Sequence, residues 1–192
     1  MNILGAIIAG GKSTRMGSDK ALIKLGSKAL IVRVVDRLLP QVDDAVINAN
    51  GDTKHLEFLE LDIVPDIETE LQTPLAGLHA ALCYAAEENF DAVVTVPSDT
   101  PFLPRDLVAK LSGDRPAIAN SKGQDHYLTG FWPTRFLPQL ERALNTSNRV
   151  QDWVQACGAV KINWAGEAYD PFMNINTPAD LKAALTLLSK VR

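Results

Sequence analysis

The chain has 192 residues, of which 46% are hydrophobic, so it is long enough to bury the core of one ordinary globular domain. Its formal net charge of −4 argues against the general basic field of a nucleic-acid binder, and any anionic ligand must be captured by local charge. Two cysteines, Cys83 and Cys157, are too few for a disulfide framework or a multi-cysteine metal site, which fits a reducing compartment.

The first apolar run, residues 3–9, has no basic region before it and is too short for a signal-peptide core or a membrane span. No later run reaches the roughly 20 apolar residues that a membrane helix needs. We therefore expect a cytoplasmic protein without a membrane segment.

Four short apolar runs rich in Val and Ile predict strands that are buried on both faces, at residues 3–8, 44–47, 61–64 and 91–96. Helical patterns lie between them. One covers residues 30–38 and ends before Pro40, and another follows Pro74, with Thr73 as its cap and Leu75, Leu78 and Leu82 as its apolar stripe. This alternation predicts a doubly wound α/β fold with a mostly parallel sheet and helices on both faces.

The C-terminal part is less regular. Residues 117–119 and 127–131 are predicted as further strands, and residues 150–157 as a short helix closed by Gly158. Residues 177–180 begin a last helix, with Asp180 placed for a variant capping box and Leu181, Leu185 and Leu188 predicted to face inward. Because no repeat or linker marks a boundary, we expect a single domain over residues 1–192.

A glycine-rich basic loop at residues 10–20 follows the first strand directly. Gly10 and Gly11 allow backbone N–H groups to approach phosphate oxygens, while Arg15 and Lys20 add positive charge. Between residues 12 and 28, five cations stand against one acid, a local net charge of +4. The pattern predicts a phosphate-binding loop, and a basic surface turn is the alternative.

Two familiar nucleotide-binding patterns do not match this loop. A Walker loop would need glycine where Ala6 stands, and the dinucleotide pattern would need glycine where Lys12 stands. The loop is therefore neither a Walker loop nor a dinucleotide-binding loop.

Polar residues follow the other predicted strands. Asp99 lies between two prolines just after the fourth strand, where a carboxylate can hold magnesium together with substrate phosphates; a turn aspartate is the alternative. Asn48 and Asp66 follow two further strands and could equally be turn residues. Since parallel strands with right-handed crossovers end on one edge, these features and the loop should converge there.

The remaining polar features indicate less. His55, His79 and His126 are too scattered in the sequence to indicate a metal site. Asn174 and Asn176 precede the last helix, so they either cap it or face a second substrate.

These segments together resemble the molybdenum cofactor guanylyltransferases, nucleotidyltransferases with a glycosyltransferase-A-like fold. The resemblance rests on residues 8–22, 48–50, 74–77, 98–101 and 174–178, which stand in the family's order across nearly the whole chain. The double glycine at Gly10 and Gly11 favours the guanylyl branch, because cytidylyl and sugar-phosphate relatives usually carry Ala-Ala-Gly there. Thr73 departs from the family pattern, which has glycine at that position.

The resemblance implies a role for each matching residue. The backbone of Ile8, Ala9 and Gly10 would contact GTP, and Lys20 would bind its phosphates. Asn48 and Asp66 would contact the nucleoside, and Asp99 would bind both magnesium and nucleotide. The further residues expected at or beside the site are Gly11, Arg15, Gly77, Asn174 and Asn176. Arg15, Lys20 and Asp99 would be the catalytic residues.

The reaction that the resemblance implies is attack by the terminal phosphate of molybdenum-molybdopterin on the α-phosphorus of GTP. Its products would be the molybdopterin guanine dinucleotide cofactor and pyrophosphate, with Mg²⁺ as cofactor. The resemblance also implies transient contact with molybdenum insertion proteins or molybdoenzyme chaperones, and neither nucleic acid nor membrane as a partner. Two alternatives stay open: a related cytidylyl- or sugar-phosphate nucleotidyltransferase, and a GTP-binding regulatory module without turnover.

Overall fold

The parallel half of the sheet is built from the four apolar runs that the sequence pattern indicates. In the computed structural model these runs form β1 (Ile3–Ile8), β4 (Asp44–Asn48), β5 (Asp62–Val64) and β6 (Ala92–Pro97). They pair in parallel in the order β5-β4-β1-β6. All six residues of β1 are buried, as expected for a strand that is covered on both faces.

The structure describes residues 1–9, 20–67, 73–147, 149–165 and 168–190, and the side chain of Lys20 also lies outside the described part. No helix within these ranges is both long and apolar enough to cross a membrane.

Three strands extend the sheet beyond β6. They are β8 (Gln124–Pro133), β7 (Ala117–Ser121) and β9 (Val160–Asn163), and the described residues form a seven-stranded sheet of order β5-β4-β1-β6-β8-β7-β9. β8 runs antiparallel to both β6 and β7, whereas β9 pairs in parallel with β7. The prediction of a mostly parallel doubly wound sheet is confirmed, but the sequence pattern did not indicate β9 or the direction of β8.

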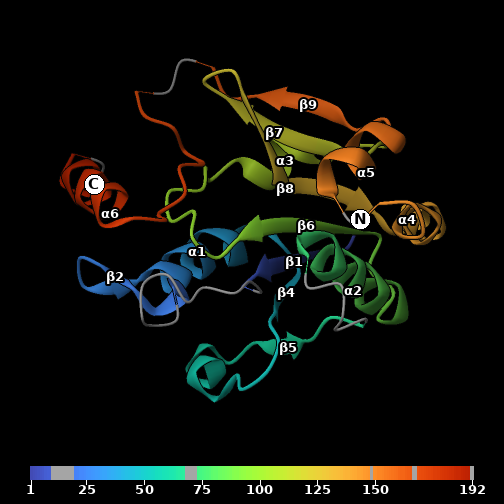
Figure 1. The fold of residues 1–192 in the computed structure, drawn as a ribbon, viewed down its shortest axis with the longest axis horizontal. Helices are drawn as coiled ribbons and strands as arrows, with labels where there is room; N and C mark the ends of the chain where they lie inside the picture. The colour runs from blue at the N-terminus through green and yellow to red at the C-terminus, as the bar shows by residue number, and fades with distance from the viewer. Residues whose placement is uncertain (10–19, 68–72, 148, 166–167, 191–192) are drawn as a thin grey trace.

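Helices cover both faces of this sheet (Figure 1). Within the described residues, the helices that cover the sheet are α1 (Leu30–Leu38), α2 (Pro74–Glu87), α3 (Leu107–Leu111), α4 (Leu137–Leu144) and α5 (Val150–Ala156). Ile7 of β1 shares one apolar cluster with α1 and α3, whereas its neighbour Ile8 shares the other cluster with α2, α4 and α5. Successive residues of a strand point to opposite faces, so β1 contributes to both cores.

The last helix, α6 (Pro178–Leu188), returns to the N-terminal part of the chain (Figure 1). Between it and α1 lies a small third core of Leu25, Leu30, Phe102, Ile175 and Ala184. The shorter described elements are the hairpin strands β2 (Lys24–Leu25) and β3 (Lys28–Ala29) and the 3₁₀ turns η2 (Lys20–Leu22), η3 (Leu39–Gln41), η4 (Lys54–Leu59) and η5 (Thr134–Phe136).

The helix ends confirm two of the predicted caps and correct a third. Thr177 and Asp180 form the capping box of α6, and Gly158 follows α5 with a φ of 62°. Thr73 stands at the N-cap of α2, but its side chain makes no capping hydrogen bond, so the prediction that it caps the helix was wrong. The prediction for Leu185 was also wrong, since it is 44% exposed and only Ala184 of α6 is buried.

Candidate active site

The predicted convergence of strand ends is observed. Ile8 pairs with Asn48 of β4 and Pro97 of β6, and Asn48 pairs with Val64 of β5, so four strands end in register at one edge. The backbone pairing continues past the strand end, where the N–H of Ala9 donates to the carbonyl of Asn48 at 2.9 Å. This edge therefore gathers the residues that the sequence pattern indicates at four separate places.

A network of two amides and a carboxylate, of which Asn48 and Asp66 are buried, occupies one side of the edge. The Nδ2 of Asn48 donates to Asp66 Oδ1 at 2.9 Å and to the carbonyl of Val64 at 3.0 Å. Asn50 binds Asp66 twice, because its Nδ2 donates to Oδ2 at 2.8 Å and its Oδ1 accepts from the backbone N–H of Asp66 at 2.8 Å. Both carboxylate oxygens of Asp66 are thus held in place, although each retains capacity to accept a further hydrogen bond.

The first turn of helix α2 packs against this network at Gly77. A Cβ atom at this glycine would lie 2.3 Å from Asn48 Oδ1, which is too close for any side chain without displacement of the amide. Asn48 is almost fully buried, at 1% exposed, so it has little room to move. Glycine is therefore needed here because helix and strand approach each other closely.

Asp99 lies at the other side of the edge, just beyond β6. Its Oδ1 accepts a 2.8 Å hydrogen bond from Asn174 Nδ2, and its backbone carbonyl accepts one from the N–H of Ile175 at 3.1 Å. The segment before α6 thereby delivers Asn174 to Asp99. Asn176 instead donates its backbone N–H to Asp180 within the α6 cap, at 3.0 Å.

Other predicted site residues fall beyond the described part. Gly10, Gly11 and Arg15 are outside it, and Lys20 is described only as the first residue of η2. Their contacts with phosphate stay predictions.

A second network, which the sequence pattern did not indicate, holds the segment that carries Asn174. Ser121 Oγ lies 2.7 Å from His126 Nε2 and donates to Asp170 Oδ1 at 2.6 Å. Asp170 Oδ1 also accepts from the N–H of Phe172 at 2.9 Å, and the Phe172 ring lies 4.8 Å from that of His126. Burial lowers the pKa of His126, against the opposing charges of Asp170 and Asp125. No sequence spacing indicates this network, because its members come from two strands and a distant segment.

Solved structures that match this fold include a molybdopterin-guanine dinucleotide biosynthesis protein and a nucleotidyl transferase. The crystal structure of molybdopterin-guanine dinucleotide biosynthesis protein A from Archaeoglobus fulgidus matches with a TM-score of 0.78 and 26% identity, covering 97% of this chain and 99% of that one. A nucleotidyl transferase from Methanothermobacter thermautotroptrophicus matches with a TM-score of 0.74 over 100% of this chain and 99% of that one; at 15% identity this likeness concerns the fold alone. Fold and site together define an enzyme of the nucleotidyltransferase class.

Within this class, the chain belongs to the family of MobA-like NTP transferase domains, whose model matches residues 5–160. The curated relatives include the molybdenum cofactor guanylyltransferase of Rhodobacter capsulatus, 41% identical over 96% of this chain and 95% of that protein. The protein of the same name from Cereibacter sphaeroides is 38% identical over 99% of both chains. These findings confirm the resemblance and the expectation of an enzyme.

Proposed function

We propose that this enzyme transfers guanylate from GTP to the terminal phosphate of molybdenum-molybdopterin and releases pyrophosphate. One observation carries the proposal: the buried Asn48–Asp66 pair and the Asp99–Asn174 pair lie at the same edge of the sheet, at the ends of parallel strands on either side of β1. Open α/β sheets bind their ligands at this edge. The names of the curated relatives supply the acceptor.

The Asp66 carboxylate suits guanine better than cytosine. An ionised carboxylate only accepts hydrogen bonds, and Asn48 and Asn50 hold both of its oxygens in fixed positions. Guanine presents two adjacent donors, its N1–H and its 2-amino group, to such an acceptor, whereas cytosine presents only its 4-amino group. Cytosine therefore offers the carboxylate one hydrogen bond fewer, and a hydrogen bond to a charged group contributes about 1.5–3 kcal/mol, which disfavours the wrong base.

The Asp99 carboxylate suits magnesium. Mg²⁺ takes oxygen ligands and is commonly held by one or two carboxylates plus substrate phosphates, and Asp99 offers such an oxygen at the strand end beside Asn174. When bound, the ion would supply charge neutralisation at the phosphates. Asn174 orients the carboxylate by its hydrogen bond, while Arg15, Lys20 and the backbone of Gly10 and Gly11 bind phosphate oxygens.

No strong general base is required for this reaction. The attacking phosphate is already an anion at neutral pH, so the task of the protein is to bring two anions together and to hold them in line. We propose that Ile8 and Ala9 contact GTP through their backbone and that Asn176, two residues after Asn174, faces the pterin substrate. Residues 1–192 would act as one domain in the cytoplasm, with transient contacts to molybdenum insertion proteins or molybdoenzyme chaperones.

Pyrophosphate release measured with GTP, CTP or ATP, with and without the pterin acceptor, tests the proposal. We expect turnover only with GTP, acceptor and magnesium together, and loss of turnover when a chelator removes the metal. Asp99→Asn should lower kcat by about a hundredfold or more, because it removes the charge that holds the metal.

Asp91→Asn is the matched control, since Asp91 is exposed and directly precedes β6, at the opposite end of the same strand from Asp99. It should keep wild-type turnover. Equal use of all nucleotides would contradict the guanine assignment. Wild-type turnover by Asp99→Asn would contradict the metal assignment, and GTP binding without any turnover would indicate a regulatory module instead.

A further inference from the structure

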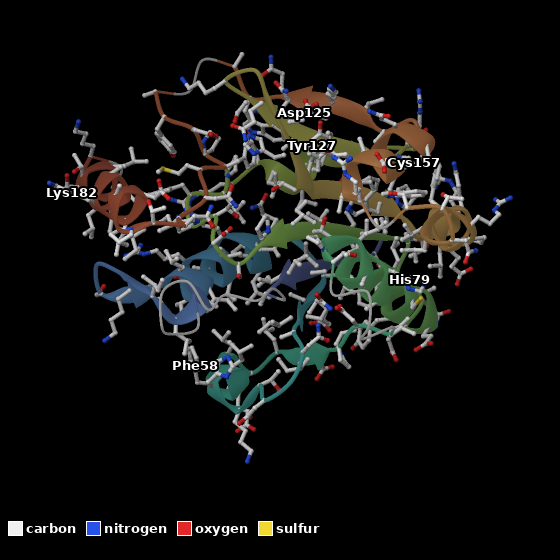
Figure 2. All side chains as sticks on the ribbon, viewed as in Figure 1. Phe58, His79, Asp125, Tyr127, Cys157 and Lys182 are labelled. Carbon is white, nitrogen blue, oxygen red and sulfur yellow. The ribbon has the colours of Figure 1, made fainter. Side chains whose placement is uncertain are left out.

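A cluster of three metal-ligating side chains lies between α2 and α4, outside the nucleotide site. His79 and Cys83 stand one helical turn apart on α2, and Glu141 faces them from α4. Their imidazole, thiol and carboxylate ligand atoms all lie within 4.8 Å of one another. Figure 2 shows His79 on α2, which packs against α4. The sequence pattern did not indicate this cluster: His79 and Cys83 are four residues apart, but Glu141 is distant along the chain.

The imidazole of His79 has no hydrogen-bond partner at Nε2 among the described residues. This atom is buried, and the closest carboxylate oxygen, Glu141 Oε1, lies 3.8 Å away, which is too far for a hydrogen bond. A buried polar atom without a hydrogen-bond partner lowers the stability of the folded state, so its presence needs an explanation. A bound cation between Nε2 and the carboxylate would supply one.

The charges around Cys83 also favour a cation. Burial, together with the nearby carboxylates of Glu141 and Glu87, raises the pKa of the Cys83 thiol to about 11. A divalent ion would stabilise the thiolate of Cys83 and offset the repulsion between the thiolate and the carboxylates.

We propose that His79, Cys83 and Glu141 bind one divalent transition-metal ion, zinc by preference, that links α2 to α4. Nitrogen, sulfur and oxygen ligands together suit zinc, whereas magnesium takes oxygen alone. Zinc–ligand distances are about 2.0–2.3 Å, so the three side chains draw together around the ion. Glu141 contributes a carboxylate that is 54% exposed and lies 3.8 Å from His79 Nε2. Binding releases the Cys83 proton to solvent and leaves a fourth position for water.

Cobalt(II) titration of the metal-stripped full-length protein tests this site, because cobalt bound by a thiolate gives a charge-transfer absorption that cobalt on oxygen ligands does not give. We expect this band to saturate at one equivalent and to disappear when zinc, but not magnesium, is added. Cys83→Ser should abolish the band. His79→Gln and Glu141→Gln should each weaken cobalt binding by about tenfold or more.

The second cysteine of the chain provides the matched control. Cys157 is buried on α5's C-terminal side and its pKa is also raised to about 11, chiefly by burial, so Cys157→Ser removes an equivalent thiol elsewhere. This variant should keep the band and the affinity. Circular dichroism establishes that each variant is folded, and Glu141→Gln alters only a half-exposed side chain. The proposal is overturned if wild-type protein gives no band, or if the band persists in Cys83→Ser.

Discussion

At the scale of single residues, the hydrogen bonds of Ser121 determine which groups in its network donate and which accept. An ionised carboxylate only accepts hydrogen bonds, so the one hydroxyl proton is donated to Asp170. The Nε2 of His126 must then donate to Ser121 Oγ, which places the proton of the neutral imidazole on Nε2. Asp170 in turn holds the backbone of Phe172, two residues before Asn174. Hence the position of Asn174 at the site depends on a buried histidine that donates a hydrogen bond from Nε2.

His126 should make the fold sensitive to mild acid. Burial lowers its folded pKa below the ordinary value of 6.5, so below that pH the unfolded chain binds a proton that the folded chain does not. The free energy of unfolding should therefore fall as pH drops below about 6.5. Urea unfolding of wild type and His126→Gln between pH 7.5 and 5.5 measures this contribution, and the advantage of the wild type should shrink toward acid.

His55→Gln is the matched control, because it removes an exposed imidazole from η4. If the difference between wild type and His126→Gln grew toward acid, the charges of Asp170 and Asp125 would outweigh burial, and the assignment of a neutral imidazole would be wrong.

At the scale of elements, the sequence pattern predicts the strands whose burial it encodes directly. Every residue of β1 is buried, so the run of apolar residues leaves no alternative to an interior strand. β8 is exposed or half-buried in its first half and buried only in its second. Its sequence pattern therefore predicts neither the full length of the strand nor its antiparallel direction. The prediction that Leu185 faces inward failed for another reason. Helical spacing identifies an apolar face, but α6 covers only a small core, so part of that face stays exposed.

The contact between helix α2 and strand β4 can be tested at Gly77. Alanine is intrinsically favoured over glycine in a helix by about 1 kcal/mol, yet here its Cβ would meet Asn48 Oδ1 at 2.3 Å. Gly77→Ala should therefore displace Asn48 from Asp66, lower the free energy of unfolding by about 1–3 kcal/mol and weaken GTP binding. Urea unfolding and calorimetric titration of GTP with magnesium measure the two effects.

Gly113→Ala is the matched control, because a Cβ there would meet nothing within 4 Å. It should leave both the stability and the affinity near wild type. A Gly77→Ala protein that is more stable than wild type and binds GTP equally well would show that Asn48 is not held as the hydrogen bonds indicate.

At the scale of the whole molecule, the fold brings together residues that lie far apart along the chain. The common edge of the parallel strands follows from the handedness of their crossovers, so the sequence could predict that Asn48, Asp66 and Asp99 lie on one side. It could not predict that Asn174, 75 positions after Asp99, donates to that carboxylate, because no periodic pattern encodes how an irregular segment returns. Hydrogen-bond partners across the fold thus needed the structure, whereas the location of the site did not.

A ligand that binds at this edge should stabilise the entire fold, because the edge exists only in the folded chain. GTP with magnesium at about 100 times its Kd adds about 2.7 kcal/mol to the free energy of unfolding. For a chain of this size, that corresponds to an increase in Tm of about 5–10 °C, measurable by differential scanning calorimetry. CTP at the same concentration should give a smaller increase, since it presents fewer donors to Asp66.

Asp99→Asn should lose the magnesium-dependent part of the increase in Tm, and Asp91→Asn should retain it. Each increase is taken against the same variant without nucleotide, so a change in intrinsic stability does not affect the comparison. Equal increases with GTP, CTP and ATP would remove the case for guanine recognition by Asp66, whereas an increase independent of both magnesium and Asp99 would remove the metal from the site and leave the base assignment intact.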